Sequence, residues 1–593
     1  MKKKDIGILA VLILLLLMWP TLGPMLQHRF FPREEYTGPP PSVPLEETSG
    51  RDAPDASDAQ AVASADPSLE AASLPVQSPE QTSLLTNDAV SITFSSHGAA
   101  VNGAVMQRYN RTLDPADGPV ELVFTNRRSL AYRGLPGLGE DGDFTIRPGE
   151  TPRSLELEGT GVSGVVLTRK ISLDENYMLR ILDTFDNPTP QPVILPDHRI
   201  QLGFMVENAS GKSLYVPYSL GVDALQYGGD GVAYLGKKVI PKALKQSGDV
   251  VIEGSLHAPV DWMAAKSRFF AQILNPDEGA DDCIWQATRS DVKSKVVSSV
   301  TAELALSGAA IPPGETFGRL YTCYIGPKKY SVIREYRRHQ EAVMNFGMFT
   351  PICKFLLWML NFMHDKLWPH NYGLATILLT VFIRVLFWPI THKGTESMRR
   401  MQEIQPLMQE LREKHKDNPQ KQQQELFALY KEHKVNPVGG CLPMLIQIPV
   451  FFALFVVLRS AIELRFASFL WISDLTQPEG LLKGVLPFGG LNLLPIVMSL
   501  MMIWQQKIMP TSADPRQAKI MQFMPVMMLF MFYPAPSGLA LYWTTNQGLM
   551  IAQQYFYKRR KDREAAEADA GSPAAKTTEA RPRNARKTRK GKG

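Results

Sequence analysis

The stretch from Tyr372 to Ile390 reads YGLATILLTVFIRVLFWPI and contains one charge, at Arg384. Its length is close to the ~20 apolar residues that a helix needs to cross the hydrocarbon core of a bilayer. His392 and Lys393 follow it, and basic residues favour the cytoplasmic side. The stretch therefore predicts a helix that crosses a membrane inward, although the mean hydropathy of the whole chain is only −0.11.

Three further apolar segments follow, at Pro437–Leu458, Val485–Gln506 and Ile520–Tyr557. The last contains no charged residue over 38 positions, which is too long for one span of ~30 Å at about 1.5 Å per residue. The segment Tyr533–Gly538, YPAPSG, divides it into two spans. The first of these, Ile520–Tyr533, would be only ~21 Å long, and such a mismatch favours local thinning of the bilayer.

The charged segment between the spans Tyr372–Ile390 and Pro437–Leu458, residues 391–436, predicts a cytoplasmic helical hairpin. It is broken at Asp417-Asn418-Pro419, where Asn418 can cap a second helix and Pro419 can open it. The apolar stripe of the hairpin is thin, so we expect light packing and mobility; it consists of Met398, Met401, Ile404, Met408 and Leu411.

Residues 346–557 thus form one predicted unit, which begins with an amphipathic helix at Phe346–His364 and contains five spans. That helix is too polar to span a membrane, and we expect it to lie along the outer interface.

Upstream, residues 88–345 predict a large antiparallel β-sandwich outside the cytoplasm. Short alternating runs such as Val90–Phe94, Gly164–Thr168 and Leu320–Tyr324 are separated by Gly, Pro, Asn and Asp clusters, a spacing typical of sandwiches. Cys283 and Cys323 lie in this domain and could form one disulfide if its compartment is oxidising.

The N-terminal region predicts an anchor and a linker. Residues 1–30 begin with three lysines before an apolar run and lack a small-x-small cleavage site, so we favour a retained transmembrane anchor over a cleaved signal peptide. Residues 31–87 are rich in Pro, Ser, Ala, Asp and Glu, which predicts a disordered linker. With the anchor, the chain would have six spans, both termini in the cytoplasm, and the sandwich in the periplasm of a double-membraned cell.

The C-terminal tail, residues 558–593, contains 13 Lys or Arg against 5 Asp or Glu, a net charge of +8, although the whole chain carries only +6. We expect it to be disordered and attracted to polyanions such as RNA or anionic lipid headgroups. The alternative is a solvated tail that only satisfies the positive-inside rule.

Arg384 is the residue that most needs an explanation, because a guanidinium inside a span costs several kcal/mol unless it faces a partner, water or the interface. The apolar segments contain no acidic residue at its depth, but they do contain Thr380, Gln447 and the run Thr544–Gln547. This pattern predicts a hydrated polar groove. Two alternatives remain open: Arg384 could snorkel to the interface, and each amide could simply hold helices together.

Four motifs in this region resemble the YidC family of membrane protein insertases: NPVGGCLP at 436–443 with QIPVF at 447–451, Arg384 before Pro389, DPRQAKIMQFMP at 514–525, and PSGLALYW at 536–543. The resemblance covers the whole chain and is most specific from about residue 346 to 557. It implies a non-enzymatic insertase with no cofactor and no metal. It also implies a sandwich similar to the sugar-mutarotase β-supersandwiches.

The resemblance further implies a five-span core with a groove open to cytoplasm and lipid. The residues that would contact clients in the groove are Arg384, Thr380, Gln447 and Asn546. Its apolar wall would consist of Tyr542 and Trp543. The family often has Tyr in place of Trp543 and a small hydroxyl residue in place of Asn546. The implied partners are nascent membrane-protein clients, the Sec translocon and its accessory subunits, membrane lipids, and the ribosome, through the tail and cytoplasmic loops.

Two other classes of protein fit the sequence less well. A secondary transporter would show repeated halves with paired broken helices, and no such repeat is visible. A membrane-anchored carbohydrate enzyme would need a paired acid and base on the sandwich, and neither His97 nor Asp261 has an obvious partner.

Overall fold

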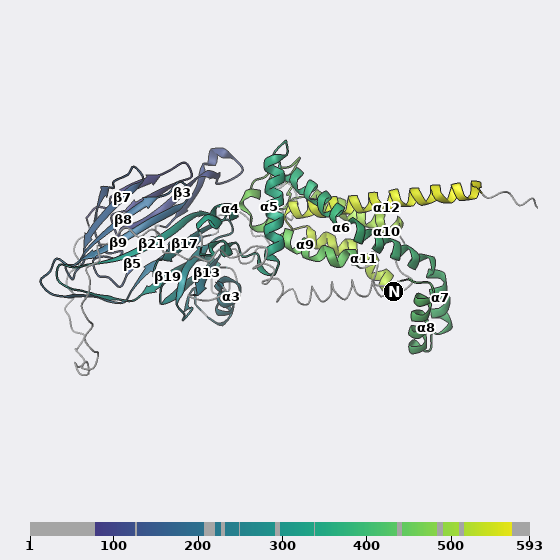
Figure 1. Cartoon of the computed structure of the whole chain (residues 1–593), viewed down its shortest axis with the longest axis horizontal. Coiled ribbons are helices and arrows are strands. Elements are labelled where there is room, and N and C mark those ends of the chain that lie inside the picture. The colour runs from purple at the N-terminus through teal and green to yellow at the C-terminus, as the bar shows by residue number, and fades with distance from the viewer. Residues whose placement is uncertain are drawn as a thin grey trace, which may run out of the picture.

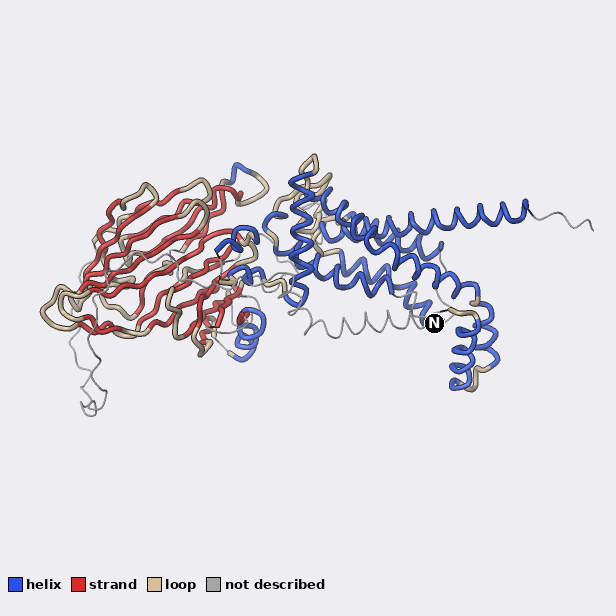
Figure 2. The backbone as a smooth tube through the Cα atoms, in the orientation of Figure 1, coloured by secondary structure: helices blue, strands red, loops and turns tan. Residues whose placement is uncertain are grey.

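The computed structural model describes residues 78–571, except 125–126, 207–219, 227–231, 248, 291–296, 337, 436–441, 483–489 and 509–514. The molecule is elongated, with β-sheets at one end and helices at the other (Figure 1). Figure 2 shows the strands gathered in one half, with a few short helices beside them, and the long helices in the other half. The predicted anchor and most of the predicted linker lie outside the described residues.

The larger sheet has nine strands in the order β14-β13-β16-β17-β21-β9-β8-β7-β6. The strands are β6 (Phe144–Pro148), β7 (Ser154–Thr160), β8 (Val166–Leu173), β9 (Met178–Asp186), β13 (Gly221–Gln226), β14 (Val232–Tyr234), β16 (Val260–Lys266), β17 (Phe270–Pro276) and β21 (Thr316–Pro327). Neighbouring strands run antiparallel, as in the long pair of β9 and β21.

A second sheet has six strands, with β15, β18, β19, β11 and β5 in order and β12 also paired to β19. Two smaller sheets have the orders β1-β2-β3-β4 and β10-β20. The strands are β5 (Tyr132–Arg133), β11 (His198–Gln201), β12 (Met205–Val206), β15 (Val251–Ser255), β18 (Asp282–Arg289), β19 (Val297–Leu306), β1 (Thr82–Thr86), β2 (Val90–Ser95), β3 (Ala100–Asn110), β4 (Pro119–Val123), β10 (Val193–Leu195) and β20 (Ala309–Ile311).

One hydrophobic core joins these sheets, because alternate side chains of each strand point inward. In β8, for example, Leu167 and Ile171 are buried, whereas Lys170 between them is exposed. Strands occur at the three places that the sequence predicted, as β2, β8 and β21.

The two cysteines of the sandwich do not form the disulfide considered from the sequence. Cys283 lies in β18 and Cys323 in β21, and both are free and fully buried. Burial raises the pKa of both thiols because the thiolate would lose its hydration. They therefore pack as small apolar residues.

The helices are α3 (Leu235–Gln246), α4 (Tyr330–Ile333), α5 (Thr350–Lys366), α6 (Tyr372–Glu403), α7 (Gln405–Lys414), α8 (Pro419–Glu432), α9 (Leu442–Ser460), α10 (Leu493–Ile508), α11 (Pro515–Phe532) and α12 (Ser537–Gly571). Short 3-10 helices are η1 (Pro115–Asp117), η2 (Arg334–Tyr336), η3 (Gln340–Met344), η4 (Gly347–Phe349) and η5 (Ile462–Leu464). In the bundle, α6 packs against α5, α9 and α12, and α10 packs against α11 and α12.

Within the described residues, one helical stretch, Tyr372–His392 of α6, is long and apolar enough to cross a membrane. Ile446–Ser460 of α9 and Met521–Phe532 of α11 are shorter apolar helices. α10 begins at Leu493, and residues 483–489, which include the start of the predicted fourth span, lie outside the described residues. The count of six spans therefore stays a prediction.

The helical hairpin is present as α7 and α8, and α6 continues into it as far as Glu403. Asn418 caps α8 by accepting a hydrogen bond from the backbone N–H of Lys421 at 3.0 Å, and Pro419 is the first residue of the helix. Ile404, Met408 and Val435 form a small separate core. The expected break and the thin apolar contact are both confirmed.

Two predictions are wrong in detail. The linker was expected to extend to residue 87, but β1 occupies Thr82–Thr86 and pairs with β2. The tail was expected to be disordered from Lys558, but α12 continues to Gly571, where Ala, Glu and Arg favour a helix. Helix α3 within the sandwich domain was not expected at all.

Candidate functional site

Arg384 lies in the middle of α6, where that helix packs against α12. Its Nη2 donates a hydrogen bond of 3.2 Å to the backbone carbonyl of Asn546 in α12. Its Nε is shielded from solvent and has no hydrogen-bond partner among the residues that the structure describes. A guanidinium carries five N–H donors, so this cation has capacity left for a further acceptor.

Gln447 of α9 donates from its side-chain nitrogen to the hydroxyl of Tyr542 in α12. Tyr542 is fully buried and lies within electrostatic reach of Arg384. Asn546, one turn further along α12, is 7% exposed and contributes its carbonyl to Arg384. The structure therefore brings Arg384, Gln447, Tyr542 and Asn546 together from three helices.

Thr380 is placed differently from the expectation. It is only 1% exposed, and its hydroxyl donates to the carbonyl of Thr376 one turn earlier, at 2.7 Å. Bonding of this kind satisfies a hydroxyl within its own helix. Thr380 therefore lies next to Arg384 along α6, but its hydroxyl is already in use.

Trp543 belongs to an aromatic cluster rather than to the polar group. Its ring lies 5.2 Å from that of Phe451 in α9 and 5.3 Å from that of Phe532 in α11. Its indole nitrogen is buried without a partner among the described residues. Tyr542 and Trp543 are adjacent in sequence but face different surroundings, because neighbouring residues on a helix point about 100° apart.

A second polar layer lies on α10 and was not expected from the sequence. Gln505 accepts a hydrogen bond from Gln547 of α12, and Gln506 donates to the carbonyl of Met521 in α11 at 2.6 Å. Ser499 donates to the carbonyl of Pro525 at 3.2 Å. The signal for this layer in the sequence is the pair of amides, Gln505 and Gln506, at the end of the predicted fourth span.

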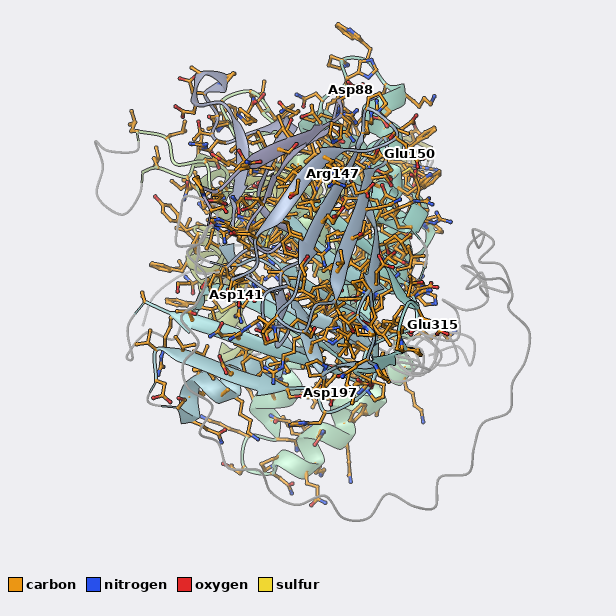
Figure 3. The ribbon with its side chains drawn as sticks, turned by 90° about the vertical axis from the view of Figure 1, so that its left-hand side faces the viewer. Asp88, Asp141, Arg147, Glu150, Asp197 and Glu315 are labelled. Carbon is orange, nitrogen blue, oxygen red and sulfur yellow. The ribbon has the colours of Figure 1, made fainter. Side chains whose placement is uncertain are left out.

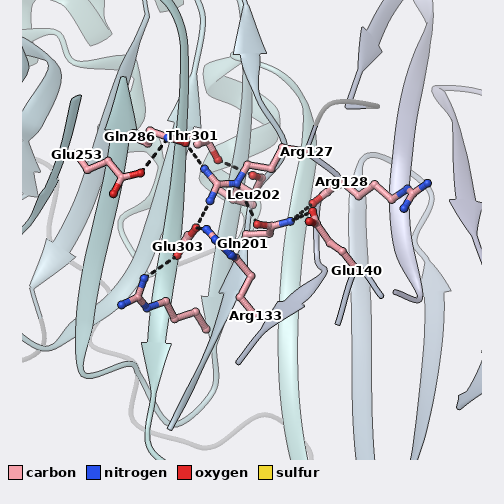
Figure 4. Close-up of polar contacts among 11 residues, drawn as sticks. Arg127, Arg128, Arg133, Glu140, Gln201, Leu202, Glu253, Gln286, Thr301 and Glu303 are labelled. Carbon is pink, nitrogen blue, oxygen red and sulfur yellow. Dashed lines mark hydrogen bonds and ion pairs between the residues drawn. The ribbon is translucent and has the colours of Figure 1, made fainter. Parts of the chain in front are cut away.

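The sandwich also contains clustered charges, but they bind one another. Glu303 of β19 accepts hydrogen bonds from Arg127, Arg133 and Arg199, the last two at 2.7 and 3.4 Å (Figure 4). The cavity beside them has a volume of about 20 Å³, which is room for about one water molecule. A sugar ring does not fit there.

The two residues considered for an enzyme on the sandwich differ in their surroundings. His97 lies 3.4 Å from Asp143, and its Nε2 is 2.9 Å from the carbonyl of Ser78. It therefore does have an acidic neighbour, contrary to the expectation. Asp261 is half-buried, and burial raises the pKa of its carboxyl group.

Two family profiles match most of the described chain. One, described as "YidC periplasmic domain", matches residues 84–359, and the other, described as "60Kd inner membrane protein", matches residues 362–564. The membrane protein insertase YidC of Geobacter sulfurreducens is 34% identical over 487 residues, which is 79% of this chain and 85% of that protein. The chain belongs to the YidC family of membrane protein insertases.

A second relative agrees with this assignment. The YidC insertase of Syntrophobacter fumaroxidans is 33% identical over 485 residues, covering 78% of this chain and 83% of that protein. A crystal structure of an active YidC insertase with its first transmembrane domain covers 81% of this chain and 93% of its own, at 18% identity and a TM-score of 0.33.

The family assignment confirms the main expectation from the sequence. The protein is an inner-membrane protein with a periplasmic domain, and it is a membrane protein insertase, which is not an enzyme. Its clients are membrane proteins. The boundary between the two family profiles, at residues 359–362, falls within α5.

Proposed function

We propose that this insertase receives hydrophobic segments of nascent membrane proteins in a polar groove between α6, α9 and α12. The observation that carries the proposal is the state of Arg384, which has one hydrogen bond to a neutral carbonyl and a buried Nε without a partner among the described residues. A cation of this kind attracts acidic or polar groups of a client more strongly in a low-dielectric site than in bulk water.

The surroundings of Arg384 support this role. Gln447 and Tyr542 supply neutral polar groups beside it, and the aromatic cluster around Trp543 supplies an apolar surface. A client segment needs both kinds of surface, because its polar ends must cross while its apolar stretch moves into lipid. Arg384, Gln447, Tyr542, Trp543 and Asn546 are therefore the proposed client-contacting residues, with Thr380 supporting α6.

The short apolar stretch of α11 supports a further part of the proposal. Met521–Phe532 comprises about 12 residues, or ~18 Å of helix against a hydrocarbon core of ~30 Å. A short span favours a locally thinner bilayer. A thinner bilayer beside the groove would lower the barrier for a polar segment that crosses.

Site-specific crosslinking tests the groove directly. A photoreactive residue at position 447 should crosslink to a stalled nascent membrane protein. One at Phe556, on the exposed surface of α12, should crosslink much less and serves as the matched control. Equal crosslinking from the two positions would contradict the proposed path.

The basic C-terminal region is proposed to contact the ribosome. Arg559, Arg560 and Arg563 are exposed on the last turns of α12, and more basic residues follow in the sequence. Phosphate contacts release counterions, so binding should weaken steeply with salt. Ribosome binding that does not change between low and physiological salt would leave only an orienting role for the tail.

The remaining parts of the proposal concern topology and partners. Both termini would lie in the cytoplasm, and the hairpin of α7 and α8 would receive clients on that side. The insertase would work alone or with the Sec translocon and its accessory subunits. Membrane lipids would contact the exposed apolar residues of α6 and α11, such as Val385, Leu386 and Phe530.

A further inference from the structure

The junction between the sandwich and the bundle contains two arginines that each bind the backbone of the other half. Arg268 lies in the turn between β16 and β17 and is 5% exposed. Its Nε donates to the carbonyl of Arg459 at 2.9 Å, and its Nη2 donates to the carbonyl of Thr476 at 2.9 Å. In the opposite direction, Arg465 donates to the carbonyls of Asn110 and Arg111, both at 3.0 Å.

Aromatic and apolar contacts surround this exchange. The guanidinium of Arg268 lies 4.7 Å from the ring centre of Phe269, and that of Arg465 lies 5.7 Å from the same ring. Ile462 of η5 is 2% exposed and is part of the hydrophobic core of the sandwich. The two halves are thus packed together at this point, not merely connected by the chain.

The two carbonyls that Arg268 binds belong to different parts of the bundle. Arg459 is in the last turn of α9, where carbonyls lack a donor within the helix and a positive charge is favourable. Thr476 belongs to the loop that holds the start of α12. There, the backbone N–H groups of Ser537 and Gly538 donate to Gln477 and Leu475 at 2.7 and 2.9 Å.

These two helices carry the proposed client-contacting residues. α9 carries Gln447, and α12 carries Tyr542 and Asn546. Tyr542 is five residues, ~8 Å, from the start of α12. A displacement of the outer end of either helix would therefore separate the side chains of Gln447 and Tyr542, which are now in contact.

We infer that Arg268 is a positioning residue for the groove, because it holds the outer ends of α9 and α12 at a fixed spacing. This inference rests on the proposed function of the groove. Arg465 serves a different purpose, since its hydrogen bonds go to β3 and the residue after it and dock the sandwich. The two arginines therefore form a natural pair for comparison across one junction.

The test uses the full chain in lipid nanodiscs, with its four cysteines replaced by alanine. Spin labels at Phe452 of α9 and Tyr555 of α12, both exposed and outside the groove, report the spacing of the two helices. Arg268→Ala should broaden the distance distribution, and Arg268→Lys should broaden it less because an ammonium can still reach one carbonyl. Arg465→Ala should leave the distribution nearly unchanged.

A second readout is client insertion at matched protein levels. Arg268→Ala should lower the insertion of a client with an acidic translocated segment by roughly threefold, as expected for the partial loss of contacts to a charged group. Arg147→Ala is the matched control, because Arg147 is an exposed arginine on the edge strand β6 and is labelled on the sandwich in Figure 3. It should change neither readout.

Two outcomes would overturn the inference. The first is an unchanged α9–α12 distance in Arg268→Ala. The second is equal broadening in Arg268→Ala and Arg465→Ala, which would mean that docking alone matters. A failure of the groove proposal would give a different pair of results. Arg384→Ala would then impair the insertion of acidic and neutral clients equally, while the change in the α9–α12 distance in Arg268→Ala would remain.

Discussion

The two halves of this protein each contain an arginine away from open solvent, and the two are used in opposite ways. Arg169 in the sandwich is fully buried and forms two hydrogen bonds with Asp183, at 2.8 and 2.6 Å. It also donates to the carbonyls of Ala99 and Leu130. Among the residues that the structure describes, Arg384 in the bundle forms one hydrogen bond, to a neutral carbonyl.

The difference shows what each charge can do. A buried ion pair whose hydrogen bonds are satisfied has no capacity left for a ligand and specifies a core. A guanidinium with an unused donor is costly to the fold and is typical of a functional position. The arginine of the sandwich stabilises a core, whereas the arginine of the bundle keeps an unused donor, and for this reason we propose that it contacts clients.

The largest expected effect comes from breaking the pair in the sandwich. Arg169→Met leaves Asp183 buried without its partner, so the free energy of unfolding of the sandwich should fall by about 3–5 kcal/mol. The double variant Arg169→Met, Asp183→Leu should recover most of this loss, because no charge remains buried. Denaturant unfolding of the full chain, followed by the β-sheet circular dichroism signal, measures both. A double variant as unstable as the single one would contradict this view of the pair.

Removal of residues 88–320 should lower insertion only moderately, because the proposed client-contacting residues lie outside the deleted segment. We expect the deletion variant to insert clients at no less than about a third of the normal rate, because what it loses near the groove is the pair of hydrogen bonds from Arg268 to the carbonyls of Arg459 and Thr476. The measurement compares client insertion by equal amounts of the membrane-integrated full chain and deletion variant. A complete loss in a stably expressed variant would revive a periplasmic activity for the sandwich.

The smallest expected effect is a pH dependence of the sandwich. Burial lowers the pKa of His198, and nearby Arg319 adds to this; the ring packs against Tyr132, whose hydroxyl donates to Asp183. The unfolded chain therefore binds a proton at a higher pH than the folded one. Stability should fall as the pH drops below about 6.5, by at most the linkage of one proton.

His198→Phe keeps an aromatic ring and removes the titration, so it should flatten this pH dependence. The reference is the same unfolding measurement at pH 7.5, where both proteins are neutral at position 198. A slope that persists in the variant would assign the pH dependence to another group.

Much of the fold was predictable from local patterns. Alternation predicted the strands of the sandwich, and Asn418-Pro419 predicted the start of α8, because capping depends on residues close in sequence. The end of α12 was not predicted, because the density of charge in this region favours disorder, whereas its Ala, Glu and Arg residues also favour a helix. The strand β1 was missed because five residues beside a polar linker carry little periodicity.

The candidate site was predictable in its residues but not in its contacts. Arg384 stood out because a charge inside an apolar stretch is rare. No local pattern indicates that its partner is the carbonyl of Asn546, 162 positions away, or that the hydroxyl of Thr380 is already bonded to its own helix. The role of Arg268 was also invisible, because an arginine in a turn between strands looks like an ordinary surface residue.

The central claim is that Arg384 acts on clients by its charge, and the most direct test is insertion of paired clients that differ only in acidic residues of the translocated segment. At matched expression, Arg384→Lys should retain most function. Arg384→Ala and Arg384→Glu should lose insertion of the acidic client, and insertion of the strongly hydrophobic client should fall much less. If Arg384 only anchors α6 at the interface, Arg384→Ala should instead impair both clients equally, and that result would contradict the account.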